Sequence, residues 1–198
     1  MKVLYFGTFD PSYGRNWVLI NGLKKNGVEV IQLRRPPGWI NLIKLFFDYL
    51  STRPAYDVMI VGFSGQEAMF LARLLTRKPI IFDAFTSHYG GYILNRRKAS
   101  KNSLKAKYYR FMDKWSCKLA DIVLLESQAY IDFFVKEYNL SPERFRRIIS
   151  FLSGVTMWIR VAYNMINGLS FKECMKNEEL DKWNIKLKYR NITYLSIK

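Results

Sequence analysis

The feature that most constrains the fold is a regular alternation of two patterns over the first three-quarters of the chain. Short runs rich in β-branched and aromatic residues predict strands at residues 2–7, 28–33, 56–62, 79–85 and 121–127. Between and after them, apolar residues at helical spacing predict helices at residues 16–27, 39–50, 65–77, 103–120 and 127–138. Strands that alternate with such helices form βαβ units. We therefore expect an α/β fold over residues 1–148, a Rossmann-like parallel sheet with helices on both faces.

The alternation stops near Arg147, and residues 149–198 show no comparable pattern. We expect this tail to form no separate domain and to be the product of a shifted reading frame. Methionine and tryptophan have a single codon each, so reading residues 157–159 from the last base of the preceding codon yields Val-Asp. The alternative is a genuine helical appendage around residues 154–169.

Parallel α/β sheets bind ligands beyond the carboxyl ends of their strands, which directs attention to the loops at those ends. After the first strand, Gly7 allows close approach of the backbone, and Arg15 and Asn16 are suited to hydrogen-bonding a sugar or phosphate. The alternative is a Gly/Pro loop that only turns the chain. The later loops contribute these further candidate ligand-binding residues: Ser64, Asp83, Thr86, Ser87 and Glu126. Ser64 and Glu126 have capping of the next helix as an alternative role, which we favour for Ser64.

His88 is the only histidine of the chain and follows the fourth predicted strand. It is a candidate general base or hydrogen-bonding partner of a substrate, and a solvated loop residue is the equally weighted alternative. The sequence lacks both G-x-G-x-x-G and G-x-x-x-x-G-K-[ST], which argues against a dinucleotide or P-loop site. A single histidine with the distant Cys117 and Cys174 cannot build a structural zinc site. We expect no metal and no resident cofactor.

Residues 2–33, residues 56–89 and the phrase ADIVLLESQAYIDFFVKEYNLSPERFRRI at residues 120–148 resemble the N-terminal domain of family 4 glycosyltransferases of the GT-B fold. The resemblance covers residues 2–148. It implies half of a GT-B fold: an acceptor-binding domain whose partner, a donor-binding domain for the nucleotide-sugar, is absent from this chain. In such enzymes FRRI leads into a phrase like Pro-Val-Gly-x-Asp-Asp, which the shifted frame of the tail permits.

The resemblance also implies roles for particular residues. Backbone amides near Gly7 and Thr8 would approach the donor phosphates, and a histidine near the exit of the fourth strand would lie by the reacting sugar. The family phrase there reads Asp-x-His, whereas this chain has Asp83-Ala84-Phe85 and places His88 three residues later.

The formal charge of +16 at pH 7 favours anionic partners. Basic and aromatic residues interleave in residues 34–53 and 95–118. We expect the following cations to contact an anionic membrane surface: Arg96, Arg97, Lys98, Lys101 and Lys105. The alternative, which we slightly favour for each segment taken alone, is that the aromatic side chains face the core while the lysines face water. Nucleic acid is a less favoured partner, because the sequence contains no recognised nucleic-acid-binding motif.

Two functions from different classes follow from these patterns. The first is the acceptor half of a glycosyltransferase, inactive alone and completed by a donor-domain polypeptide or by a lost C-terminal domain. The second is a non-enzymatic basic Rossmann-like module that binds an anionic membrane surface or nucleic acid. The expected location is the cytoplasm, with peripheral attachment to the inner membrane face, because no run reaches the ~18 apolar residues of a spanning helix.

Overall fold

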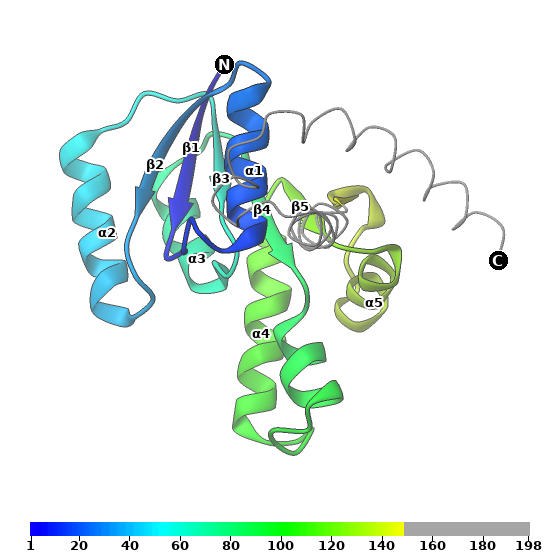
Figure 1. Cartoon of the computed structure of the whole chain (residues 1–198). Helices are drawn as coiled ribbons and strands as arrows, with labels where there is room; N and C mark the ends of the chain where they lie inside the picture. The colour runs from blue at the N-terminus through cyan, green and yellow to red at the C-terminus, as the bar shows by residue number, and fades with distance from the viewer. Residues whose placement is uncertain (149–198) are drawn as a thin grey trace, which may run out of the picture. The chain divides into compact units, whose positions relative to one another are not determined.

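The computed structural model describes residues 1–148, which form an α/β fold around a six-stranded, all-parallel sheet (Figure 1). The strand order is β2-β1-β3-β4-β5-β6. The strands are β1 (Lys2–Gly7), β2 (Glu29–Arg34), β3 (Val58–Val61), β4 (Ile80–Phe85), β5 (Ile122–Leu125) and β6 (Phe145–Arg147). The predicted Rossmann-like parallel sheet is confirmed. Strand β6, which pairs with β5, is an addition that the sequence patterns did not predict.

The helices also agree with the predicted alternation. They are α1 (Gly14–Lys25), α2 (Trp39–Thr52), α3 (Gln66–Leu75), α4 (Leu104–Leu119) and α5 (Gln128–Tyr138). Two short helical segments were not predicted: the π-helical η1 (Tyr89–Asn95) and the 3₁₀-helical η2 (Pro142–Arg144). Helix α1 ends close to the end of the helix predicted at residues 16–27, since Asn26 is its C-cap and Gly27 has a φ of +73°.

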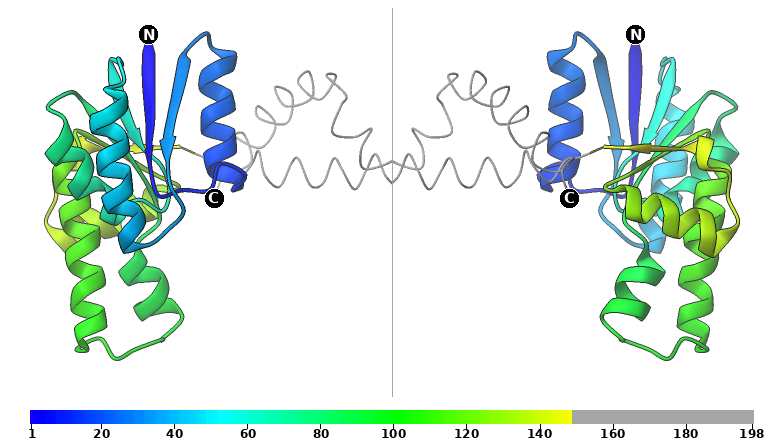
Figure 2. Two further views of the ribbon diagram at one scale, coloured as in Figure 1. Left: turned by 90° about the vertical axis from the view of Figure 1, so that its left-hand side faces the viewer. Right: turned by 90° about the vertical axis from the view of Figure 1, so that its right-hand side faces the viewer.

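Helices cover both faces of the sheet, but unequally. The chain reverses its direction across the sheet once, after β2, and right-handed crossovers then place α1 on one face and the later helices on the other. Figure 2 shows α1 on the opposite side of the sheet from α2, α3 and α4. The α1 face has a small core around Tyr5, Ile20 and Ile60.

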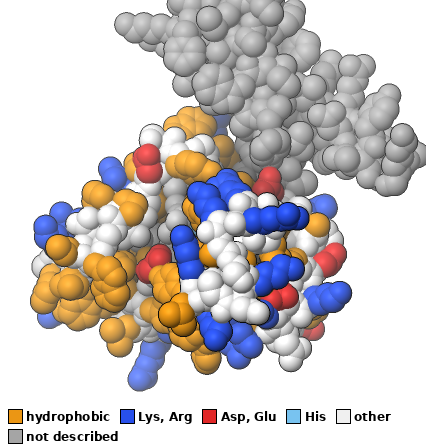
Figure 3. Space-filling view, turned by 90° about the horizontal axis from the view of Figure 1, so that it is seen from below, with side chains coloured by type: hydrophobic (Ala, Val, Ile, Leu, Met, Phe, Trp, Pro, Cys, Tyr) orange, Lys and Arg blue, Asp and Glu red, His pale blue; other side chains and the backbone are white. Residues whose placement is uncertain are grey.

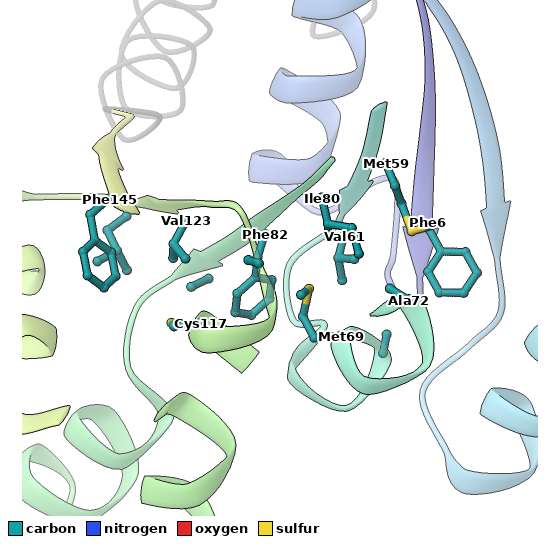
Figure 4. Close-up of a cluster of buried hydrophobic side chains, with 14 of the residues drawn as sticks. Phe6, Met59, Val61, Met69, Ala72, Ile80, Phe82, Cys117, Val123 and Phe145 are labelled. Carbon is teal, nitrogen blue, oxygen red and sulfur yellow. The ribbon is translucent and has the colours of Figure 1, made fainter. Parts of the chain in front are cut away.

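The larger core lies between the sheet and α2, α3, α4 and α5. Figure 4 shows part of it, with strand side chains directed towards α3 and α4. Its labelled members are Phe6, Met59, Val61, Met69, Ala72, Ile80, Phe82, Cys117, Val123 and Phe145. Because β1, β3, β4 and β5 are buried on both faces, they read in the sequence as continuous apolar runs.

One part of the domain extends beyond the carboxyl edge of the sheet (Figure 1). It consists of η1, the connection at residues 96–103 and the first half of α4, and we call residues 89–111 the basic hairpin. Asp113 and Glu67 lie outside it, and the hairpin itself contains no Asp or Glu. The most cationic stretch of the described chain is therefore placed at the edge where parallel sheets bind their ligands.

The predicted tail, residues 149–198, lies outside the described residues, and the expectation of a shifted reading frame stays a prediction. No helix in residues 1–148 has both the length and the apolar character needed to cross a membrane.

Two serines precede helices, Ser127 before α5 and Ser64 before α3, and only Ser127 caps its helix. Ser127 is the N-cap of α5 and its side chain accepts a hydrogen bond from the Tyr130 amide at 3.3 Å. The predicted capping role of Ser64 is wrong, because the N-cap of α3 is Gly65 and makes no side-chain cap bond. Helix α3 therefore begins one residue later than a cap at Ser64 would require.

We expect Ser127→Ala to lower the free energy of unfolding by about 1 kcal/mol, since the Tyr130 amide loses its acceptor. Ser64→Ala should change it by less than about 0.5 kcal/mol. Urea denaturation of both variants measures the difference. Equal losses at the two positions would contradict the assigned caps.

Candidate functional site

The candidate site lies at the carboxyl ends of β1 and β3. Strand β1 is flanked by β2 and β3, so the connections after β1 and after β3 depart in opposite directions and leave a topological switch point. Ligands of open α/β sheets bind at such a point. We call residues 8–13 and 62–65 the switch-point loops. Gly7 and Thr8, both buried, stand at the exit of β1, and the half-buried Ser64 stands after β3.

Asn16 joins the two switch-point loops. Its Oδ1 accepts hydrogen bonds from the Tyr5 hydroxyl at 3.0 Å and the Phe63 amide at 3.1 Å. Its Nδ2 donates to the carbonyl oxygens of Asp10 at 2.9 Å and Phe63 at 2.8 Å. Every hydrogen-bonding position of this buried amide is thus used within the protein. Asn16 holds the loops together, and its direct contact with a ligand stays a prediction.

Arg15 and Asp83 form a buried ion pair beside the same site. The Arg15 Nε lies 2.7 and 2.8 Å from the two carboxylate oxygens, and the side chains are 2% and 0% exposed. Burial raises the pKa of Asp83, against the lowering effect of the guanidinium. The pair ties the start of α1 to β4, which gives two predicted ligand-binding residues a structural role. Ligand contact by either residue stays a prediction.

An aromatic cluster borders this ion pair. The Arg15 guanidinium lies 4.6 Å from the ring centroid of Phe85. Phe85 meets Phe63 edge-on at 5.1 Å, and Phe63 lies 5.3 Å from Tyr13, which is 47% exposed. These rings provide an apolar surface at the switch point, the usual lining of small-molecule sites.

Phe85 has a strained backbone. Its φ is +60°, a region that bulky residues rarely adopt, and the register between β4 and β5 shifts between Asp83 and Phe85. Such outliers and bulges cluster at functional sites. The sequence analysis did not single out Tyr13, Phe63 or Phe85. The available signal was their position: each aromatic residue lies at a strand exit or in the loop that follows one.

Gln66 is a further residue that the sequence analysis did not identify. It opens α3, directly after a switch-point loop, and is 1% exposed. Within the described part of the chain, its Oε1 has no hydrogen-bond partner. Buried polar atoms in native proteins are normally paired, so an unpaired acceptor here calls for a donor.

His88 lies apart from the switch-point loops, at the base of the basic hairpin. Its half-buried ring is edge-on to Tyr92 and Tyr109, with centroids 5.9 and 6.0 Å away. Its backbone amide donates to Asp113 Oδ1 at 3.1 Å. The structure therefore holds the position of His88 firmly, while a catalytic role stays a prediction.

Asp113 organises the turn that carries His88, and the sequence analysis missed it. Its Oδ2 accepts hydrogen bonds from Ser87 Oγ at 2.6 Å, the Tyr89 amide at 2.9 Å and the Tyr138 hydroxyl at 3.1 Å. Burial raises the pKa of Asp113, and the bonds from Ser87 and Tyr89 oppose that rise. A carboxylate at a core-facing position of α4 was the available signal.

The structure thus divides the predicted site residues into groups. Gly7, Thr8, Arg15, Asn16, Ser64 and Asp83 lie around the switch point. Thr86, Ser87 and His88 form the turn after β4, and the Ser87 hydroxyl is engaged by Asp113. Glu126 follows β5 beside this turn, since its amide donates to the Phe85 carbonyl oxygen at 3.1 Å. Within residues 1–148, no three His, Cys, Asp or Glu side chains gather closely enough to hold a metal ion.

The predicted membrane-contacting cations lie on the basic hairpin. Arg96, Arg97, Lys98, Lys101 and Lys105 are all exposed. Side chains of the hairpin also line a hollow of about 670 Å³: Ile93, Leu94, Arg97, Ala99, Ser100 and Lys101. The alternative that the aromatic residues of α4 face the core is wrong for Tyr108, Phe111 and Trp115, whose side chains are exposed.

No protein-family model matches the chain, and a search of curated proteins found no match either.

Proposed function

We propose that residues 1–148 are the acceptor-binding half of a glycosyltransferase that takes its sugar from a nucleotide-sugar. One observation carries the proposal: an all-parallel sheet whose switch point gathers the loops that resemble those of family 4 glycosyltransferases. Sites of this fold lie at the switch point. The reaction class, glycosyl transfer, comes from the resemblance of residues 2–33, 56–89 and 120–148 to family 4 glycosyltransferases.

The proposed roles follow from the contacts at that edge. The aromatic surface of Tyr13 and Phe63 would receive the apolar face of an acceptor. The buried Arg15–Asp83 pair and the Asn16 bonds would keep these groups in place before the acceptor arrives. The acceptor would extend from the switch-point loops to the turn after β4, where His88 would act on its reacting hydroxyl as a base.

The donor would be bound by a second domain, as the resemblance implies. Glycosyl transfer requires that donor, acceptor and stabilising groups be held in one closed cleft. Under this proposal residues 1–148 supply the acceptor side of that cleft.

We expect the chain alone to show no transfer from any nucleotide-sugar. A chimera that joins residues 1–148 to the donor-binding domain of a family 4 glycosyltransferase should transfer sugar to an acceptor in a product screen. In the active chimera, His88→Ala should reduce kcat by about 100-fold, the usual contribution of a general base.

Gln32→Ala is the control for this experiment, because Gln32 is exposed on the edge strand β2. Its kcat should match that of the parent chimera. Turnover by the chain alone would contradict the proposal that donor binding needs a second domain. Full activity of the His88→Ala chimera would contradict the role of His88. An inactive chimera whose two halves are both folded would favour the non-enzymatic module.

A further inference from the structure

Helix α2 carries apolar side chains on both of its sides. Leu45 is fully buried, and Leu42 and Tyr49 pack partly against the main core. Five further large apolar side chains face solvent: Trp39, Ile40, Ile43, Phe47 and Leu50. Their spacing of three or four residues aligns them along one side of the helix. Trp39 is 84% exposed, so the core of this domain does not account for this stripe.

Helix α4 has a stripe of the same kind. Its core side presents Met112, Ser116 and Cys117. Leu104, Tyr108, Phe111 and Trp115 are exposed and follow one another at intervals of four, three and four residues. That spacing places them on one helix face, away from the sheet. Leu104, at the start of α4 in the basic hairpin, is 84% exposed.

The two stripes belong to one layer of helices. Helix α3 packs beside both α2 and α4, and its Phe70 stacks on Phe111 with centroids 6.0 Å apart. Leu74 of α3 is also exposed. All exposed large apolar side chains of residues 1–148, except Met1, Tyr13 and Trp17, lie on these three helices. We call this set of exposed apolar side chains on α2, α3 and α4 the apolar face. Large apolar side chains that gather on neighbouring helices and face solvent indicate an interaction site.

The charges around the apolar face are almost all positive. The basic hairpin supplies Arg96, Arg97, Lys98, Lys101, Lys105 and Lys107, and the second half of α4 adds Lys114 and Lys118. The acidic side chains of the three helices are already engaged. Asp48 is paired with Arg35, Glu67 accepts from the Tyr108 hydroxyl, and Asp113 is buried. Figure 3 shows Lys and Arg side chains beside apolar ones on the side of the molecule that carries the hairpin.

We propose that the apolar face and the basic hairpin dock together on the surface of an anionic lipid bilayer. Apolar stripes rich in Trp, Phe and Leu that are bordered by Lys and Arg lie in the membrane interface, with the apolar side chains in the boundary of headgroups and acyl chains. Trp and Tyr favour that depth because their rings are amphipathic. The cations of the hairpin then meet lipid phosphates.

The charge pattern favours a bilayer over a second copy of this chain. Two such faces brought together would oppose their cations, and like charges at an interface disfavour association. A bilayer also satisfies both parts of the surface at once, since it offers anionic phosphates above an apolar interior. The proposal does not depend on glycosyl transfer, so vesicle binding and chimera turnover can each fail separately.

The test is co-sedimentation of the full chain with vesicles of phosphatidylcholine, with and without phosphatidylglycerol, at low and high salt. We expect binding to the anionic vesicles only, and release by salt. The Phe47→Glu/Leu104→Glu variant should bind at least about tenfold more weakly, because charged side chains are expelled from the apolar region. The matched control is Trp17→Glu on α1, which is 48% exposed on the opposite side of the sheet and should bind as the parent does.

A second pair of variants tests the cations. Arg96→Glu/Arg97→Glu should also weaken binding about tenfold, whereas Lys24→Glu/Lys25→Glu at the end of α1 should have little effect. Equal binding to neutral vesicles would overturn the proposal. The proposal would also be overturned if the variants of the apolar face and of the hairpin bound vesicles as strongly as their control variants do. A different result would show that a second copy covers the face. The parent protein would then self-associate in ultracentrifugation without binding vesicles, and Phe47→Glu/Leu104→Glu would abolish this self-association.

Discussion

Replacing Asp83 by asparagine should lower the free energy of unfolding by about 3 kcal/mol, a large part of the stability of a domain of this size. The carboxylate meets Arg15 through two short hydrogen bonds, and both side chains are inaccessible to water. The asparagine keeps the shape of the side chain but leaves a buried guanidinium without this counter-charge. Removal of one partner from a buried ion pair is destabilising because the other charge stays desolvated.

Urea denaturation measures this loss, and two variants serve as comparisons. The double replacement Arg15→Met/Asp83→Leu should recover most of the lost stability, because apolar side chains of similar volume remove both desolvated charges. Glu29→Gln, in the exposed pair with Lys2, should cost less than about 1 kcal/mol. If Asp83→Asn lowers the free energy of unfolding no more than Glu29→Gln does, the buried pair does not stabilise the switch point.

Asp113→Asn should also lower the free energy of unfolding, by roughly 3 kcal/mol. The carboxylate accepts hydrogen bonds from the Ser87 and Tyr138 hydroxyls and from the amides of His88 and Tyr89. An asparagine has a single oxygen acceptor, and in either orientation its NH₂ group would face a backbone amide, that of His88 or that of Tyr89, which cannot accept a hydrogen bond. The unsatisfied groups would be buried, which is the costly case.

Two measurements test this second result. The free energy of unfolding should fall far more for Asp113→Asn than for Tyr138→Phe, which removes one donor and should cost about 1 kcal/mol. Amide hydrogen exchange at His88 and Tyr89 should become faster in Asp113→Asn than in Tyr138→Phe. Unchanged exchange at both amides would show that Asp113 does not hold the turn that carries His88.

Much of the fold could be predicted from local pattern. The helical and strand periods of residues 1–138 indicated every long element, because each depends on which side of a short segment is apolar. The elements that were missed lack such a pattern. Phe145–Arg147 is a strand of three residues, two of them basic, which exists because β5 offers it an edge. Tyr89–Asn95 contains a glycine pair, which predicts a loop, yet the Asp113 bonds hold the start of that turn in place.

The candidate site shows the limit of local pattern. Position after a strand correctly brought Gly7, Thr8 and Ser64 to the switch point, since parallel strands end at one edge of the sheet. The same argument proposed Arg15 and Asn16 as ligand contacts, but the structure buries both side chains and uses them to hold loops. Whether a polar side chain faces a ligand or another segment depends on residues far away in the chain, here Asp83 and Phe63.

By itself, the sequence determined the parallel α/β architecture, the edge at which the loops gather and the excess of positive charge, because periodicity, chain direction and composition are local or additive properties. Only the tertiary structure decided which side of α2 and α4 is covered. Both helices have apolar residues on more than one side, so their sequences fit two orientations. Packing against the sheet selects Leu45 and Cys117 for the core and leaves the stripes of Phe47 and Phe111 in solvent.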